Sequence, residues 1–278
     1  MTGKNNKKRF DRILKDIKSV KIQGARNIAR AALEAYNLMP TESSKKKLLS
    51  SRPTEPMMEN ILDLASKGKS IKEINNHLNS AQEKINNGVL KLIKTNDVLF
   101  THCHSTNVVN ALIYARKKGK RHFEVYNTET RPLLQGRKTA KQLRKAGIPV
   151  TMFVDSALNV ALTKTQGTKK VDRIFLGADA LTKDGIINKI GSNLIAQIAK
   201  DNKIPVYIVA DSWKFTNRRV PIEQRNLNEV WDNAPKNIKI KNPAFEFVNK
   251  KYIKAIISEL GVLNYDSFVR KAQKINPK

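Results

Sequence analysis

Cysteine is nearly absent from the sequence: Cys103 is the only one among 278 residues. A single thiol excludes an intramolecular disulfide framework, and this agrees with a reducing compartment. The histidines on either side, His102 and His104, raise the question of zinc. Three adjacent residues do not provide the spaced ligand pairs of a structural zinc site, so we expect no metal.

Long apolar runs are absent as well. No stretch of about 18 apolar residues occurs, and residues 1–10 are rich in Lys and Asn with no apolar segment behind them. We therefore expect a soluble cytoplasmic protein with no membrane partner. The apolar content of 40% is typical of a globular chain with a substantial core.

Acidic residues are scarce: 24 Asp and Glu stand against 53 Lys and Arg, which gives a net charge of +29. Such an excess often indicates a nucleic-acid or other polyanionic partner. The basic residues are spread along the whole chain, however, aromatics are only 6%, and no zinc-finger or RNP pattern occurs. We expect a solvated basic surface more than nucleic-acid binding, and the sequence leaves a polyanionic ligand open.

The first third of the chain has helical periodicity. Apolar residues recur at helical spacing over residues 9–38 and again over 71–92. Residues 40–47 are polar and are expected to form a connection, whereas Arg52-Pro53-Thr54 is expected to open a helix, because proline favours the first turn. The sequence therefore predicts an N-terminal helical domain over residues 1–95.

The remaining residues, 96–278, alternate between strand-like and helix-like segments. This alternation predicts βαβ units with a parallel sheet, and thus an α/β chain whose second domain is Rossmann-like. No Walker or dinucleotide glycine fingerprint is present, so no cofactor is expected. The predicted strands lie at 97–101, 122–127, 149–154, 172–177 and 205–210, and the predicted helices at 106–118, 136–147 and 188–202.

Polar residues follow each predicted strand, and the carboxyl ends of parallel strands are where ligands collect. They are expected to meet in one cleft. In chain order they are Cys103 and Ser105, Thr128 to Arg131, Asp155 and Ser156, Gly177 to Asp179, and Asp211 to Lys214.

The chemistry of such a cleft depends first on Cys103 and Asp179. A thiol at a strand-to-helix turn has its pKa lowered by the helix N-terminus, and protonated His102 or His104 would add to this. Burial at an apolar strand end would raise the pKa of Asp179 and let it donate a proton. The alternatives are a small buried hydrophobe for Cys103 and a helix cap or ion pair for Asp179. Candidate cations for phosphate groups are Arg52, Arg131, Lys189 and Lys214.

Five ordered motifs together resemble the superfamily of initiation factor 2B regulatory subunits and sugar-phosphate isomerases, over about Val20 to Val262. Within it, the likeness is greatest to the archaeal isomerases that act on ribose 1,5-bisphosphate. The motifs are Thr101-His102-Cys103-His104-Ser105, Thr128-Glu129-Thr130-Arg131-Pro132 with Gln135-Gly136, Gly177-Ala178-Asp179-Ala180, Asn188-Lys189-Ile190-Gly191 and Asn242-Pro243-Ala244-Phe245.

This resemblance implies conversion of ribose 1,5-bisphosphate to ribulose 1,5-bisphosphate during nucleoside monophosphate degradation. It implies that Cys103 is the proton-abstracting base and Asp179 the partner acid. It also implies no metal, a homo-oligomer (a dimer or a hexamer), and it leaves an AMP activator open. The substrate contacts it implies are Gly24, Ala25 and Arg26 in a phosphate-cradling turn, the phosphate-binding Arg52, and Ser105, Asn188, Lys189 and Lys214.

The sequence departs from the superfamily pattern at several points. Gln23 stands where the isomerase turn usually has an arginine, the connection over residues 40–51 is short, and Glu246 is not followed by Thr-Pro-Pro. Two alternative functions stay open for this reason. One is a regulatory subunit that binds a translation initiation factor, and the other is a methylthioribose-1-phosphate isomerase, which shares the cysteine and the aspartate.

Overall fold

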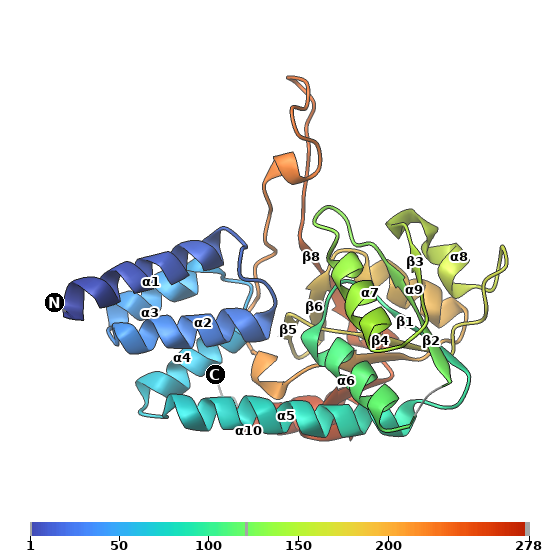
Figure 1. The fold of residues 1–278 in the computed structure, drawn as a ribbon, viewed down its shortest axis with the longest axis horizontal. Coiled ribbons are helices and arrows are strands. Elements are labelled where there is room, and N and C mark those ends of the chain that lie inside the picture. The colour runs from blue at the N-terminus through green and yellow to red at the C-terminus, as the bar shows by residue number, and fades with distance from the viewer. Residues whose placement is uncertain (1, 120–121, 276–278) are drawn as a thin grey trace.

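The computed structural model describes residues 2–119 and 122–275. A group of helices lies beside a sheet with helices on both faces (Figure 1). The helical part consists of α1 (Thr2–Lys18), α2 (Ala25–Leu38), α3 (Glu42–Ser51), α4 (Pro56–Ser66) and α5 (Ile71–Leu92). Its core is formed by apolar side chains at helical spacing, among them Ile17, Ile28, Leu48 and Ile61, which are completely buried.

Helix α3 corrects the sequence prediction, because residues 40–47 were expected to form a connection. The local pattern there is polar, with Leu48 as the fully buried apolar residue. The helix is started instead by Thr41, whose hydroxyl accepts a hydrogen bond from the Ser44 N–H at 3.1 Å. Arg52-Pro53-Thr54 consequently lies in the turn after α3, and the next helix begins at Pro56.

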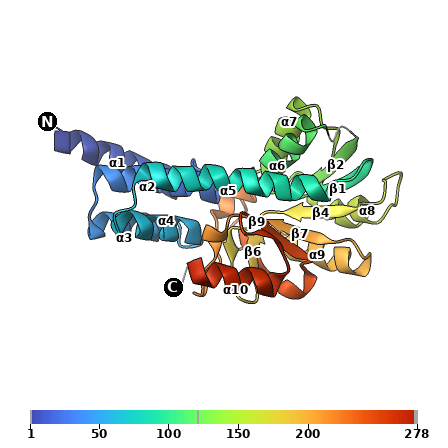
Figure 2. The ribbon, with the colours of Figure 1, turned by 90° about the horizontal axis from the view of Figure 1, so that it is seen from below.

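Helix α5 joins the helical part to the sheet. It starts with a capping box formed by Ser70 and Glu73 and runs along most of the molecule (Figure 2). Ile74 and Leu78 pack into the helical core, whereas Ile85 and Val89 pack against the sheet. The division of the chain at residue 95 stays a prediction about which parts fold as units.

The α/β fold predicted from the sequence is confirmed. A seven-stranded sheet has the order β10-β9-β7-β4-β1-β2-β3, and every neighbouring pair is parallel except β9 and β10. The five predicted strands each lie within one residue of their predicted bounds. The strands are β1 (Asp97–Thr101), β2 (Phe123–Thr128), β3 (Val150–Phe153), β4 (Arg173–Leu176), β7 (Val206–Val209), β9 (Ala255–Ser258) and β10 (Gly261–Leu263).

Helices cover both faces of this sheet because alternate strand residues are buried on opposite sides. Leu99 and Val125 pack against α5, α6 and α7, whereas Phe100 and Ile174 pack against α8, α9 and α10. The helices of the α/β part are α6 (Thr106–Lys117), α7 (Gln135–Lys145), α8 (Leu158–Leu162), α9 (Ser192–Asp201) and α10 (Tyr265–Ile275). No helix within the described ranges combines the length and apolar character that crossing a bilayer needs.

A second, antiparallel sheet was not predicted. It consists of β5 (Ala180–Leu181), β6 (Gly185–Lys189) and β8 (Phe245–Asn249), in that order. Residues 188–191 were expected to begin a helix, but Asn188 and Lys189 lie on β6, and α9 starts only after Gly191, whose φ is 101°. The reason is the pairing of β6 with β8, a partner too distant in the sequence for local periodicity to indicate.

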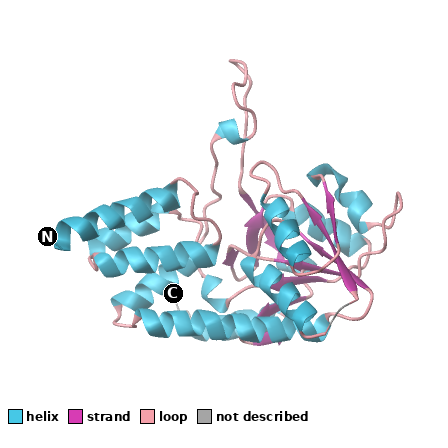
Figure 3. Ribbon diagram, in the orientation of Figure 1, coloured by secondary structure: helices cyan, strands magenta, loops and turns pink. Residues whose placement is uncertain are grey.

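The residues between Arg225 and Asn242 form an arm that projects away from both parts of the molecule (Figure 1, orange). Figure 3 shows that the arm is mostly loop, with one short helical turn, η3 (Leu227–Glu229). At its base the Ala244 N–H donates to the Glu223 carbonyl and the Arg225 N–H donates to the Asn242 carbonyl, both at 2.9 Å. These bonds join the two sides of the arm at its base, directly before β8 begins.

Candidate active site

One cavity lies at the carboxyl ends of β1 and β4, between the start of α2 and the second sheet. The predicted site residues come from at least five separate segments of the chain, and the cavity brings almost all of them together. Those that line it are Gly24, Ala25, Arg26, Arg52, Cys103, Ser105, Asp179, Asn188, Lys189 and Lys214. Arg131 is a predicted site residue that does not line the cavity. Its side chain is exposed, and its guanidinium donates to the Val230 carbonyl in the arm at 3.3 Å.

The turn from β1 to α6 holds Cys103 in a left-handed conformation, with a φ of 65°. Two hydrogen bonds fix this backbone: the Cys103 N–H donates to the Thr130 hydroxyl at 3.0 Å, and the Thr139 hydroxyl donates to the Cys103 carbonyl at 2.8 Å. Ser105 then caps α6. A left-handed backbone is strained for a non-glycine residue, and these two hydrogen bonds stabilise it.

The thiol of Cys103 does not have the lowered pKa that the sequence predicted. Burial raises its pKa to about 12, although the Lys189 ammonium acts in the opposite direction. The prediction was wrong because desolvation outweighs both the Lys189 ammonium and the hydrogen bond from the His104 backbone N–H, which favour the thiolate. In the free protein at neutral pH, Cys103 is therefore a protonated thiol.

The two histidines beside Cys103 do not supply positive charge. Burial lowers the pKa of His102, whose Nε2–H donates to the Ile190 carbonyl at 2.8 Å. Its Nδ1 then accepts from the Thr128 hydroxyl at 2.5 Å, as a neutral ring requires. Burial also lowers the pKa of His104 to about 4. Both imidazoles are neutral near pH 7, and they hold the turn through hydrogen bonds.

Asp179 follows β4, and its side chain faces the same cavity as the thiol. Burial raises its pKa, while the cations Lys214, Arg52 and Lys189 act to lower it. The raised pKa of Asp179 agrees with the prediction that burial at an apolar strand end would raise it. A carboxyl group with a raised pKa can hold a proton near neutrality and donate it to a ligand oxygen.

Two buried lysines face the cavity from different elements. Lys189 on β6 and Lys214 in η2 (Ser212–Lys214) are about 6% and 5% exposed. The Lys214 ammonium donates to the Ala178 carbonyl at 2.6 Å, which places it beside Asp179. Their positive charges make the cavity suitable for an anion.

The start of α2 borders the opposite side of the cavity. Gly24 precedes the helix with a φ of 83°, a conformation that favours glycine. The Arg26 guanidinium donates to Gln82 at 3.2 Å and to Asn79 at 3.0 Å, so α5 holds it in place. A helix N-terminus with an adjacent arginine is a typical phosphate site.

Sequence reasoning missed Glu55, Glu223 and Arg225, which surround Arg52. The Arg52 Nε donates to Glu223 at 3.1 Å and its Nη2 to Glu55 at 3.4 Å, and Arg225 pairs with the other Glu223 oxygen at 2.9 Å. Glu55 and Arg225 both line the cavity. Arg52 and Glu223 are 171 positions apart. The one local signal was an acidic residue three positions after an arginine.

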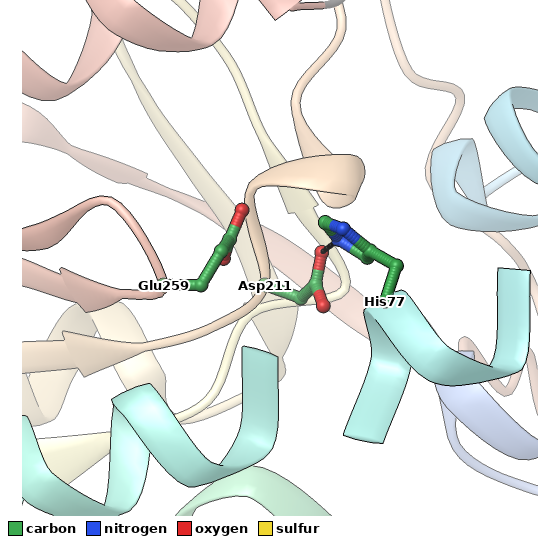
Figure 4. A group of neighbouring side chains, drawn as sticks. All are labelled: His77, Asp211 and Glu259. Atoms are coloured by element: carbon green, nitrogen blue, oxygen red, sulfur yellow. Dashed lines mark ion pairs between the residues drawn. The ribbon is translucent and has the colours of Figure 1, made fainter. Parts of the chain in front are cut away.

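A second group of polar side chains connects α5 to the sheet (Figure 4). His77 stacks on Trp213 with the ring centroids 3.6 Å apart, and its Nε2 lies 3.7 Å from an Asp211 oxygen. The same Asp211 oxygen accepts from the Trp213 N–H at 2.9 Å. Glu259 accepts from the Ser212 N–H at 3.1 Å and from its hydroxyl. These contacts hold η2, and with it Lys214, at the edge of the cavity.

Comparison with known proteins agrees with the sequence motifs. The family described as the initiation factor 2 subunit family matches residues 20–265. The ribose 1,5-bisphosphate isomerase of Methanocaldococcus jannaschii is 36% identical, over 89% of this chain and 89% of its own. The methylthioribose-1-phosphate isomerase of Thermosipho melanesiensis is 30% identical, over 96% of this chain and 90% of its own.

Among solved structures, the Pyrococcus horikoshii OT3 translation initiation factor eIF-2B superposes with a TM-score of 0.79 at 25% identity, and the match covers 92% of this chain and 97% of that one. The similarity therefore includes the helical part and the α/β part together. Because the family match covers residues 20–265, which is most of the chain, the chain belongs to the initiation factor 2 subunit family.

Proposed function

We propose that this protein is an aldose–ketose isomerase that converts ribose 1,5-bisphosphate to ribulose 1,5-bisphosphate. The observation that carries the proposal is one cavity in which the thiol of Cys103 and the carboxyl group of Asp179 lie among buried cations. A bisphosphate carries roughly four negative charges, and such cations with a helix start are what bind phosphate groups. The relative from Methanocaldococcus jannaschii supports the same substrate.

In the proposed mechanism, Asp179 donates a proton to the ring oxygen as the bond from that oxygen to C1 breaks. Cys103, as the thiolate, removes the proton from C2, which leaves an enol between C1 and C2. Return of this proton from Cys103 to C1, while the C2 hydroxyl passes its proton to the Asp179 carboxylate, then gives the ketone at C2 and restores both groups. The raised pKa of Asp179 supports its role as the acid. Since burial also raises the pKa of Cys103, the thiolate must form in the substrate complex, where Lys189 is the cation that favours it.

Turnover by two variants tests these roles. Cys103→Ser and Asp179→Asn keep the size of each side chain but remove the base or the acid. Each is expected to lower kcat by about 10²- to 10⁴-fold, as loss of a proton-transfer group generally does. Ribulose 1,5-bisphosphate formation is measured by coupling to RuBisCO, and circular dichroism checks that both variants fold. Substantial turnover by both variants would refute the assigned roles.

The proposal places the enzyme in nucleoside monophosphate degradation, with AMP as a candidate activator. Assays with and without AMP test the activator. We also propose a homo-oligomer, either a dimer or a hexamer. The projecting arm supports this, because its apolar side chains Leu227, Val230, Trp231 and Ile238 are 40–50% exposed. Light scattering of the purified protein distinguishes the two assemblies from a monomer.

A second candidate substrate is methylthioribose 1-phosphate, which has one phosphate group instead of two. The ion pair between Arg52 and Glu223 favours this candidate, because it leaves the arginine less positive charge for a second phosphate. The relative from Thermosipho melanesiensis also agrees with it. Turnover of this compound, with none of the bisphosphate, would replace the first proposal. Recovery of an initiation factor in a pull-down, with neither substrate turned over, would favour a regulatory subunit.

A further inference from the structure

The surroundings of Arg52 contain three charged side chains that are almost completely buried and incompletely paired. The side chains of Arg52, Glu55 and Arg225 are 5%, 1% and 9% exposed. Each has at least one buried polar atom without a hydrogen-bond partner among the described residues: Nη1 of Arg52, Oε2 of Glu55, and Nη1 and Nε of Arg225, of which the Nε still forms an ion pair with Glu223. All three residues line the cavity. Buried polar atoms are rarely left unpaired in a folded protein, so these atoms indicate a place for a polar ligand.

The charges around this place indicate an anion. The two arginines and the nearby lysines, Lys189 and Lys214, are cationic, whereas burial raises the pKa of both Asp179 and Glu55. Glu223 pairs with both arginines. These three acidic side chains, two of them with raised pKa values, do not neutralise four cations, and a phosphate group supplies both negative charge and acceptor oxygens for the unpaired guanidinium nitrogens.

We propose that Arg52, Arg225 and Glu55 form a phosphate subsite in which Glu55 is protonated and donates a hydrogen bond to a phosphate oxygen. This rests on the proposed function, since it takes the ligand to be a sugar bisphosphate. An ionised Glu55 would repel the phosphate. A protonated Glu55 can instead donate a hydrogen bond from its unpaired oxygen, Oε2, to a phosphate oxygen. The subsite differs in this way from one built from cations alone.

The groups that face Glu55 come from every element around it. Burial is the main cause that raises its pKa, to about 8, followed by the Asp179 carboxyl group at the end of β4. Arg52 in the turn after α3 and Lys214 in η2 act to lower it, and Glu223 at the base of the arm acts to raise it. A bound phosphate adds negative charge and raises the pKa further. Binding therefore takes up a proton at any pH where free Glu55 is ionised.

The experiment is titration calorimetry with ribulose 1,5-bisphosphate at pH 8.5, in two buffers that differ in their enthalpy of ionisation. Free Glu55 with a pKa of about 8 is roughly one quarter protonated at that pH, so the wild-type protein is expected to take up about three quarters of a proton per site. The dissociation constant is expected to rise about 10-fold between pH 7 and pH 9. Both measurements use the unmodified protein and do not depend on how a variant folds.

Glu55→Gln is the decisive variant, because glutamine remains a neutral donor at every pH. Its proton uptake is expected to fall to near zero, with less than about a twofold change in affinity over the same range. Glu223→Gln is the matched control: it also removes a carboxylate from Arg52, but its proton uptake is expected to persist. Equal uptake by wild type and Glu55→Gln would overturn the proposal, since Lys189 or another group would then be its source.

The same titrations separate this inference from the proposed function. Proton uptake that depends on Glu55, together with no turnover, would keep the phosphate subsite and refute the isomerase. Turnover without such uptake would keep the isomerase and refute the role of Glu55. No binding of the bisphosphate at either pH would overturn the subsite.

Discussion

Cys103 is expected to react very slowly with alkylating agents, although it lines an accessible cavity. Only the thiolate is nucleophilic, and burial raises the pKa of this thiol to about 12. An ordinary thiol with a pKa of about 8.5 is roughly one quarter ionised at pH 8, whereas one with a pKa of about 12 is ionised in about 1 molecule in 10⁴. The predicted difference in reaction rate at pH 8 is therefore about 2,000-fold.

The assay is alkylation by iodoacetamide, followed by mass spectrometry of the intact protein. Because Cys103 is the only cysteine, one added group reports on this residue alone, and the Cys103→Ser variant gives the background. The reference rate is that of the same protein unfolded in urea. The rate for the folded protein is expected to rise about 10-fold for each pH unit up to pH 10, with no plateau. A folded-state rate within about 10-fold of the unfolded rate at pH 8 would refute the assigned desolvation.

Two further predictions concern stability. Trp213→Ala is expected to lower the free energy of unfolding by about 3–5 kcal/mol, because Trp213 is buried in the helical core and stacks on His77. Urea denaturation measures this change, and Leu194→Ala is the control: its side chain is 51% exposed, so it is expected to change the free energy of unfolding by less than about 0.5 kcal/mol. Burial lowers the pKa of His104 to about 4, whereas an unfolded histidine has a pKa of about 6.5. Between these two pH values the unfolded chain binds a proton at His104 and the folded chain does not. The free energy of unfolding is therefore expected to fall as the pH decreases from about 6.5 to about 4. His104→Gln is expected to lose less stability than wild type between pH 7 and pH 5, and an unchanged pH dependence would contradict the assigned shift.

Most of the helices and strands were predicted from the local pattern of apolar residues. The strands of the large sheet are short apolar runs with helices between them, and residues a few positions apart are enough to specify such segments. The same reasoning failed for α3, where a polar segment forms a helix because Thr41 caps it and Leu48 is buried. It also failed for the second sheet, because β6 pairs with β8, and α9, β7 and the arm separate these two strands in the sequence.

The candidate site, like the fold, was predicted only in part from the sequence. Residues after strand ends were expected to converge, and the cavity does contain Cys103, Ser105 and Asp179. The residues after β2 and β3, Thr128 to Arg131 with Asp155 and Ser156, are not among those that line it. Glu55 and Arg225 were not predicted, since each has significance only through contacts with distant residues. Arg131 was predicted from its place after β2, but its side chain lies against the arm instead.

The order of elements, the single thiol, the excess of basic charge and the placement of polar residues at strand ends all follow from the amino-acid sequence. These properties depend on composition or on neighbours within a few positions. The tertiary structure decided which carboxylates surround Arg52, and it decided that the Cys103 pKa rises instead of falling. Desolvation and ion pairing are set by side chains brought together from distant parts of the chain, and the free energies involved are large enough to reverse a local preference.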